Sequence, residues 1–259
     1  MTSVAELFFS NAALFALVAS RVTGFIVVSP FPGQNVSTTQ RISLVVVVSW
    51  LASTFAPATA APRALDLTLA GPAVFEVACG GIIGVAFRLV YATAEVLGGV
   101  LGLATGLGTP SVLNPTLEAP DTVIGRIVTL GAMLVALSAG IHRIALGALL
   151  ESFRALPVGS AMAPDAPMLR LVELWIDSFV VGVQLATPVI GVALLIHVAL
   201  GVVSRAAPSL QIFSVGFTLL FATGIFTIIR GLDDTVAGLG THFQRLTPFI
   251  DEALTAIRR

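Results

Sequence analysis

Six long apolar stretches run through the sequence, separated by short segments that contain proline, glycine or charged residues. Each stretch is much longer than an average β-strand of about 5–6 residues and lacks strand-like alternation, so each is predicted to be helical. Helices also satisfy their own backbone hydrogen bonds where no water is present. The pattern predicts an all-α integral membrane protein with about six hydrophobic helices. The stretches are Leu7–Val28, Ile42–Phe55, Pro72–Gly106, Val123–Phe153, Leu171–Val203 and Ile212–Ile229.

The lengths of the stretches do not fit a simple bundle of six spanning helices. A spanning helix needs roughly 20 residues, whereas Ile42–Phe55 is shorter and Pro72–Gly106 is longer. Charged residues also fall inside or beside the stretches, and a charge at the bilayer centre costs about 2.5–3.5 kcal/mol on insertion scales. We therefore expect these residues, and nearby glycines spaced for close helix packing, to face protein or a polar lumen. The candidate buried ionisable or subunit-packing residues are Arg21, Glu76, Arg88, Glu95, Gly98, Gly102, Arg126, His142, Asp177 and His197.

Two of these residues share one face of the third helix. Arg88 and Glu95 are seven residues apart, with Tyr91 between them. One interpretation is an internal polar stripe that pairs with neighbouring helices. The alternative is that Glu95 is a carboxylate that responds to protons.

The composition after Ile229 changes to an amphipathic pattern. Apolar residues recur at intervals of three, four and seven from Val236 to Ile257, and Pro248 interrupts the pattern. This tail is predicted to lie on the bilayer surface or on a partner protein. Its few basic residues make membrane adsorption the weaker option.

Overall composition excludes an ordinary soluble enzyme. Only 10% of the 259 residues are charged, against about 25% in soluble domains, and the mean hydropathy is +1.01. The chain contains no lysine, so it has no Walker A loop and no Schiff-base lysine. Its single cysteine excludes an internal disulfide and a cysteine-based zinc site. We expect no catalytic residues, no cofactor, no metal site and, with a net charge of −1, no nucleic-acid partner.

The segment between the third and fourth stretches is unusual for a loop. Residues 106–120 contain three prolines and almost no charge, whereas loops that face water are normally polar. The segment is either a rigid turn between helices or an apolar loop that contacts protein or constricts a pore. Its candidate pore or gate residues are Gly106, Leu107, Gly108, Pro110, Val112, Leu113, Asn114 and Pro115.

Several short segments together resemble one family of membrane proteins. They are Ala19-Ser-Arg21-Val-Thr-Gly24 before Ser29-Pro30, Gly84-Val-Ala-Phe-Arg88 with Ala94-Glu95-x-x-Gly98, and Gly106-Leu followed by Asn114-Pro115. Ile141-His142 precedes Ser152-Phe153-x-x-Leu156-Pro157-x-Gly159, and Leu200-Gly201-Val-Val-Ser204-Arg205-Ala206-Ala207-Pro208 precedes Phe213 and Gly216-Phe217. With these segments the chain resembles the FliR family of the flagellar type III export apparatus, from the first helix to the sixth. It departs from the family pattern at His197, Gln211 and Thr218, among other positions.

The resemblance implies a structural subunit of the flagellar protein export gate. Such proteins assemble with FliP and FliQ into a channel for unfolded flagellar subunits, above FlhB and FlhA, at the flagellar basal body in the bacterial inner membrane. It also implies a FliP-like part over residues 1–170, a FliQ-like helical hairpin over 171–231 and an amphipathic tail over 232–259. Loop 106–120 would then lie at the channel lumen. The expected hairpin tip contains Gly201, Arg205, Pro208 and Phe213.

Two other functions remain open at this point. A virulence injectisome homologue would be the same kind of machine with a different cargo. An autonomous proton-coupled transporter of small solutes is suggested only by Glu95, Asp177 and His197.

Overall fold

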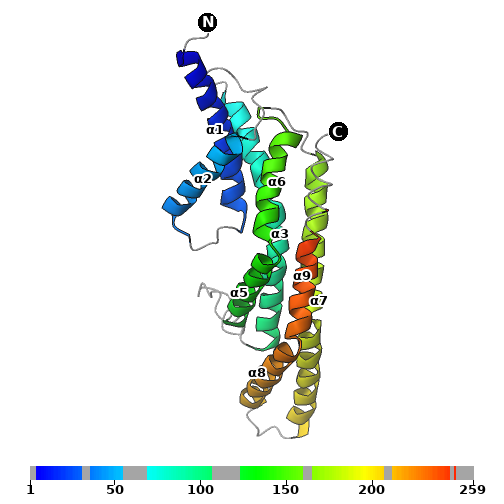
Figure 1. The fold of residues 1–259 in the computed structure, drawn as a ribbon. Helices are drawn as coiled ribbons and strands as arrows, with labels where there is room; N and C mark the ends of the chain where they lie inside the picture. The colour runs from blue at the N-terminus through cyan, green and yellow to red at the C-terminus, as the bar shows by residue number, and fades with distance from the viewer. Residues whose placement is uncertain are drawn as a thin grey trace. The chain divides into compact units, whose positions relative to one another are not determined.

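The structure is a computed structural model that describes residues 4–30, 36–54, 69–106, 123–159, 165–206, 212–245 and 248, with backbone alone at 4–11, 165–168 and 212–214. In these ranges the chain is helical and contains no strand, which confirms the prediction of an all-α fold (Figure 1). The helices are α1 (Val4–Val28), α2 (Thr38–Ser53), α3 (Ala70–Ala104), α5 (Val123–Ser138), α6 (Ile141–Ala155), α7 (Asp165–Ala206), α8 (Ile212–Arg230) and α9 (Leu232–Gln244).

The helix boundaries require one correction to the sequence prediction. The fourth apolar stretch is two helices, α5 and α6, and not one helix over Val123–Phe153. Gly140 lies between them in the left-handed conformation, with a φ of +75°. A residue with a side chain rarely adopts this backbone conformation, whereas glycine does so at little cost. The helix therefore ends at this glycine although the residues on both sides are apolar.

The described chain forms two compact units. The first comprises Met1–Val90, Gly140–Trp175 and Arg245–Arg259, and the second comprises Tyr91–Ala139 and Ile176–Gln244. Helices α3 and α7 therefore contribute residues to both units.

In the first unit, α1 and α3 approach each other at glycines. A Cβ atom on Gly24 would overlap the backbone of Val77, and one on Gly80 would overlap the backbone of Arg21. Small residues allow such close contact between helices in apolar surroundings. The aromatic rings of Phe25 and Phe87 then meet edge to face, with 6.3 Å between their centroids.

The second unit uses the same kind of contact. A Cβ atom on Gly98 of α3 would lie 2.8 Å from the Cα atom of Gly125 on α5, closer than real Cβ atoms approach their neighbours. The hydroxyl of Tyr91 also donates to the carbonyl oxygen of Thr129, 3.3 Å away, and so links the same two helices. The contact between the two glycines and the hydrogen bond of Tyr91 together fix the packing of α3 against α5.

Helix α9, the described part of the tail, packs within the second unit. It lies beside α7 (Figure 1), where Gly238 faces the side chain of Leu185, and it also contacts α5. Leu239, His242 and Phe243 are buried at the spacing of one helix face. Part of the apolar face of α9 is therefore covered by its own chain, whereas Leu232 and Val236 are exposed. The prediction that the tail lies on the bilayer surface or on a partner protein stays a prediction.

Two described helices are long and apolar enough to cross a membrane. They are α3, with 35 residues, and the part of α7 from Leu169 to Ala206, with 38 residues. Two further pairs, α5 with α6 and α8 with α9, are each bent at a short break, and the number rises to four if each pair is one span. At 1.5 Å per residue, α3 is about 50 Å long and exceeds the roughly 30 Å hydrocarbon core.

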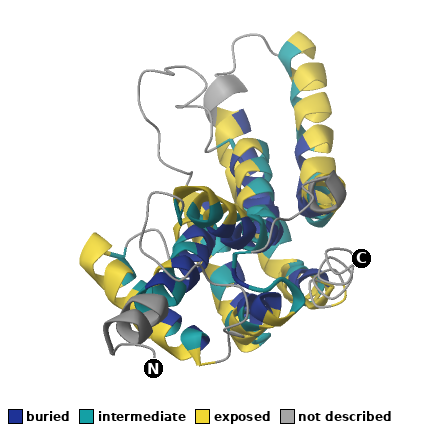
Figure 2. Ribbon diagram, turned by 90° about the horizontal axis from the view of Figure 1, so that it is seen from above, coloured by how far each residue is buried: buried dark blue, intermediate teal, exposed yellow. Residues whose placement is uncertain are grey.

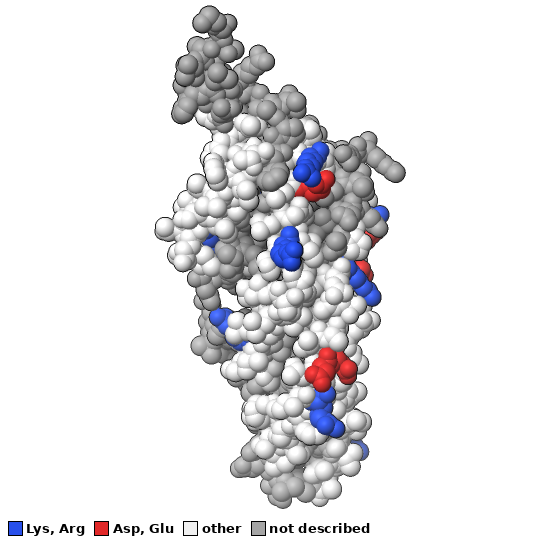
Figure 3. All heavy atoms as spheres, in the orientation of Figure 1, with Lys and Arg blue, Asp and Glu red and all other residues white. Residues whose placement is uncertain are grey.

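Large apolar side chains are widely exposed on the single chain. Figure 2 shows whole turns of several helices as exposed, and Figure 3 shows a surface on which charged groups are sparse. Trp50 on α2 is 68% exposed and Leu195 on α7 is 71% exposed. Exposed apolar surfaces of this kind mark contacts with a membrane or with other proteins.

Candidate functional site

A buried ion pair joins α1 and α3 in the first unit. Arg21 is 0% exposed and Glu76 is 2% exposed. The Nε group of Arg21 donates a hydrogen bond to Oε2 of Glu76. Because both charges are withdrawn from solvent, each depends on the other and on further polar partners for stability.

Arg21 also binds the end of α6. Its Nη1 group donates to the carbonyl oxygens of Ser152, at 2.9 Å, and of Leu156, at 3.1 Å. The last carbonyl groups of a helix lack intrahelical donors and carry the negative end of the helix dipole. The guanidinium group therefore caps the C-terminus of α6 with a positive charge.

Two further contacts complete the environment of the pair. The backbone N–H of Gly159 donates to Oε1 of Glu76 at 2.8 Å. The guanidinium carbon of Arg21 lies 4.4 Å from the centre of the Phe153 ring, a cation–π distance. We call these residues the Arg21–Glu76 cluster: Arg21, Glu76, Ser152, Phe153, Leu156 and Gly159.

Glycine packing explains why this cluster forms. Gly80 follows Glu76 by one helical turn and lies against the backbone of Arg21 itself. A larger residue at this position would move α3 away from α1. The close approach brings the carboxylate within reach of the guanidinium group.

The chemistry of the cluster is that of a structural clamp. The carboxylate and the guanidinium group are both buried and hydrogen-bonded to the protein, so neither is presented to a substrate. In the described part of the chain, no three histidine, cysteine, aspartate or glutamate side chains gather as metal ligands would. The cluster holds three helices together in surroundings where an unpaired charge would be costly.

Apart from Glu76, the cluster residues come from segments that resemble one family in sequence. Residues 12–246 match the family model described as bacterial export proteins, family 1. The chain belongs to this family. The match includes every residue of the Arg21–Glu76 cluster.

Curated relatives cover most of the chain. It is 28% identical over 242 residues to the flagellar biosynthetic protein FliR of Aquifex aeolicus, covering 91% of this chain and 92% of that protein. The protein of the same name from Caulobacter vibrioides is 27% identical over 219 residues, 84% of this chain and 87% of the relative. That of Escherichia coli is 29% identical over 185 residues, 70% of each.

The other candidate residues of the export protein lie in varied surroundings. Gly98 and Gly102 are buried within the second unit. Arg88 is half-buried, and the half-buried His142 lines a small apolar pocket of about 130 Å³ with residues of α1, α2 and α6. The exposed candidates in the single chain are Glu95, Arg126, Asp177, His197, Gly201 and Arg205. For Glu95, Arg126, Asp177 and His197, the expectation that they face protein or a polar lumen stays a prediction.

Most of the predicted gate lies outside the described residues. Gly106 is the exception: it ends the turn after α3 with a φ of +81°, and a Cβ atom there would lie 3.3 Å from the Phe217 ring. The gate and tip positions outside the described residues are Leu107, Gly108, Pro110, Val112, Leu113, Asn114, Pro115 and Pro208. For Phe213, which lies in α8, only the backbone is described.

Sequence reasoning missed one buried polar contact in the second unit. The hydroxyl of Ser178 on α7 lies 3.4 Å from Nε2 of His242 on α9, and both residues are buried. His242 stands between the apolar residues Leu239 and Phe243 on one face of α9. That pattern signals that the histidine faces a protein interior.

Proposed function

We propose that this chain is a structural subunit of the flagellar type III protein export gate. In this proposal it assembles with FliP and FliQ in the bacterial inner membrane, at the flagellar basal body. The assembly forms the channel through which unfolded flagellar subunits leave the cell, and FlhB and FlhA lie beneath it. The chain contributes structure and carries out no catalysis.

Membership of the bacterial export family is the observation that carries this proposal. The family match spans residues 12–246, and relatives named for flagellar biosynthesis cover up to 91% of the chain. These names favour the flagellar machine over an injectisome. An autonomous transporter has less support, because Glu95, Asp177 and His197 are exposed on the single chain and do not form a shared internal site.

The distribution of polar and apolar groups agrees with a subunit role. The buried charges of Arg21 and Glu76 in the first unit pair with each other inside the chain, although Nη2 of Arg21 has no hydrogen-bond partner among the described residues. Large apolar side chains point outward on α2 and α7, including Trp50 and Trp175. These exposed apolar side chains need apolar surroundings, which partner helices and lipid supply together.

The proposal retains the division into a FliP-like part, a FliQ-like hairpin and a tail. Helices α7 and α8 supply the two arms of the hairpin, and Gly216 of α8 packs against Leu200 of α7 near their connection. Loop 106–120 is proposed as part of the channel closure. Its apolar residues and prolines suit a stiff constriction that a polypeptide can push open.

A genetic test addresses the flagellar role. Deleting the gene should abolish swimming and the appearance of hook and filament subunits in the medium, and a plasmid copy should restore both. Cells that still export these subunits normally without the gene would overturn the proposal. A specific loss of secreted virulence effectors, with flagellar export intact, would instead identify an injectisome subunit.

A further inference from the structure

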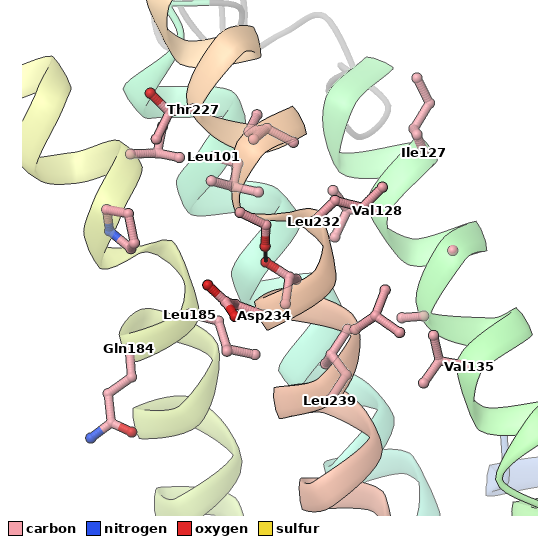
Figure 4. Close-up of a pocket in the computed structure, with 18 residues that line it drawn as sticks. Leu101, Ile127, Val128, Val135, Gln184, Leu185, Thr227, Leu232, Asp234 and Leu239 are labelled. Carbon is pink, nitrogen blue, oxygen red and sulfur yellow. Dashed lines mark hydrogen bonds between the residues drawn. The ribbon is translucent and has the colours of Figure 1, made fainter.

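The second unit contains an apolar pocket that the proposed function does not account for. Its volume is about 400 Å³, and it lies between α5, α7, α8 and α9, with Leu101 contributed by α3. Figure 4 shows that hydrocarbon side chains from these helices, among them Val128, Leu185 and Leu239, point into a common space. Water is a poor occupant of such a space, because it needs two to four polar partners.

Three irregular features of the helices create this space. Pro188 lies inside α7, where it has no backbone N–H for the preceding turn. The α8–α9 pair bends by 59° at its break, where Gly231 lines the pocket. Gly131 of α5 also lines it, and a Cβ atom there would meet nothing within 4 Å. Proline, bend and glycine all leave room at the same place.

The rim of the pocket is apolar and exposed. Ile127 of α5 and Leu232 of α9 line the pocket and are more than half exposed, and the lining residue Val236 is exposed as well. The pocket therefore opens onto an apolar surface of the single chain. An exposed apolar surface beside a pocket is typical of a protein interface, where a large side chain of one partner fills a pocket of the other.

One carboxylate lies among these apolar residues. Asp234 lines the pocket and is exposed, and in the part of the chain that the structure describes it forms no ion pair. Arg126 of α5 and Arg230 of α8 are not among the described lining residues. Segments 107–122 and 207–211 of this unit lie outside the described residues and contain no arginine, lysine or histidine. We therefore expect a basic partner for this carboxylate to come from another molecule.

The depth of Asp234 favours a protein as that molecule. The part of α7 from Leu169 to Ala206 is a candidate span, and the lining residue Pro188 lies halfway along it. The α8–α9 pair, taken as one span, has its break at Gly231 near the middle. Lipid head groups stay at the two surfaces of the bilayer. Charged residues inside spans instead pair with one another in the interior of a helix assembly.

We infer that a membrane helix of another export-apparatus subunit docks at this pocket, with apolar side chains in the pocket and an arginine or lysine beside Asp234. The inference rests on the proposed function, because it requires a complex of different subunits. The docked helix covers the apolar rim and gives the carboxylate its partner. The charge pair also makes the contact selective, since a helix without the basic residue leaves Asp234 unpaired.

Photo-crosslinking in membranes tests this inference. The full-length chain is expressed with the rest of its export apparatus and carries benzoylphenylalanine in place of Ile127 on the rim. Crosslinked peptides are mapped by mass spectrometry. We expect a crosslink to a hydrophobic helix of a different subunit, with an arginine or lysine within about one helical turn of the crosslinked residue.

Charge exchange tests the role of Asp234. Asp234→Arg should lower the crosslink yield by about five-fold or more, and changing the mapped basic residue of the partner to aspartate should restore it. Asp233→Arg is the matched control and should keep the crosslink, because Asp233 is also exposed in the first turn of α9 but is not a lining residue. Immunoblotting of membranes checks that each variant accumulates.

A second pair of variants tests the pocket without changing a charge. Gly131→Ala adds a Cβ atom that meets nothing within 4 Å and should keep the crosslink. Gly131→Trp should fill the pocket and remove the crosslink, because Gly131 is one of the lining residues.

The inference would be overturned by a crosslink to lipid, to a second copy of this chain or to a helix without a basic residue, or by no crosslink at all. An unchanged crosslink in Asp234→Arg, or equal crosslinks in the two Gly131 variants, would overturn it as well. If FliP and FliQ still co-purify with the chain in any of these cases, the inference fails alone and the proposed function stands. Loss of swimming and export on gene deletion tests the proposed function separately.

Discussion

Arg21 and Glu76 are 55 residues apart in the chain, and their side chains form a buried ion pair between α1 and α3. The same arginine caps the end of α6 through the carbonyl oxygen of Leu156, 135 residues further along the chain. Three helices of the first unit therefore depend on one guanidinium group. Substitutions at this pair should therefore disturb the packing of all three helices.

Removing either charge of the pair should strongly destabilise the protein. Glu76→Ala or Arg21→Ala leaves the other charge buried without its partner, which typically costs about 3–5 kcal/mol. We expect each single variant to accumulate poorly in membranes, as measured by immunoblotting and by thermal unfolding of the purified complex. The double variant Arg21→Met with Glu76→Leu should recover part of the loss, because no unpaired charge remains.

The control for this prediction is an exposed ion pair. Arg154 and Glu151 form one at 3.2 Å, and both side chains are more than half exposed. Arg154→Ala should change stability by no more than about 1 kcal/mol. If Arg21→Ala were tolerated as well as Arg154→Ala, the cluster would not be a clamp.

Two adjacent glycines of α3 should respond in opposite ways to alanine. A Cβ atom on Gly80 would overlap the backbone of Arg21, whereas one on Gly81 meets nothing within 4 Å. Gly80→Ala should therefore destabilise by about 1–3 kcal/mol, as overpacking does. Gly81→Ala should be neutral or stabilise the helix by up to about 1 kcal/mol. Thermal unfolding of the two variants side by side measures the difference, and equal midpoints would rule out the proposed helix contact.

Helix α9 should matter for stability through its buried face. Phe243 is 1% exposed, so Phe243→Ala should cost about 3–5 kcal/mol. Thr241 is exposed on the same helix, and Thr241→Ala should stay within about 0.5 kcal/mol of the unchanged protein. Limited proteolysis reports the result, because a loosened α9 becomes accessible to cleavage. Identical cleavage of both variants would show that α9 does not pack on the chain as described.

The proposed gate loop can be tested by deletion. Removing Leu107–Leu113 should leave subunit assembly largely intact, since these residues form a connection between helices. It should increase the leakage of ions or small solutes through the assembled complex, because an apolar constriction blocks them when closed. Conductance of the reconstituted complex gives the readout. An assembled complex that remains as tight as the unchanged one would identify the loop as a structural turn.

Hydropathy alone predicted most helices of this chain, because apolar runs of this length have few alternatives in a membrane protein. It failed at Gly140, where the chain is apolar on both sides and only the backbone conformation ends the helix. It also left open what α9 packs against, because an amphipathic pattern shows that one face is covered without showing what covers it.

The Arg21–Glu76 cluster illustrates a second limit. Both residues stand out in the sequence because a charge within an apolar stretch needs a partner. Their pairing depends on the approach of α1 and α3 at Gly24 and Gly80, which no local pattern encodes. The segment from Ser152 to Gly159 stood out in the sequence because it resembles a family motif. In the structure, the carbonyl oxygen of Ser152 binds Arg21 and the backbone N–H of Gly159 binds Glu76.

The central claim, that this chain is a subunit of a flagellar export gate, is tested most directly by its partners in the membrane. The tagged full-length chain is purified from membranes of flagellated cells under mild conditions, and the co-purifying proteins are identified by mass spectrometry. The account predicts a stable complex that contains FliP and FliQ. A homo-oligomer of this chain alone, stable and monodisperse with neither protein present, would contradict it.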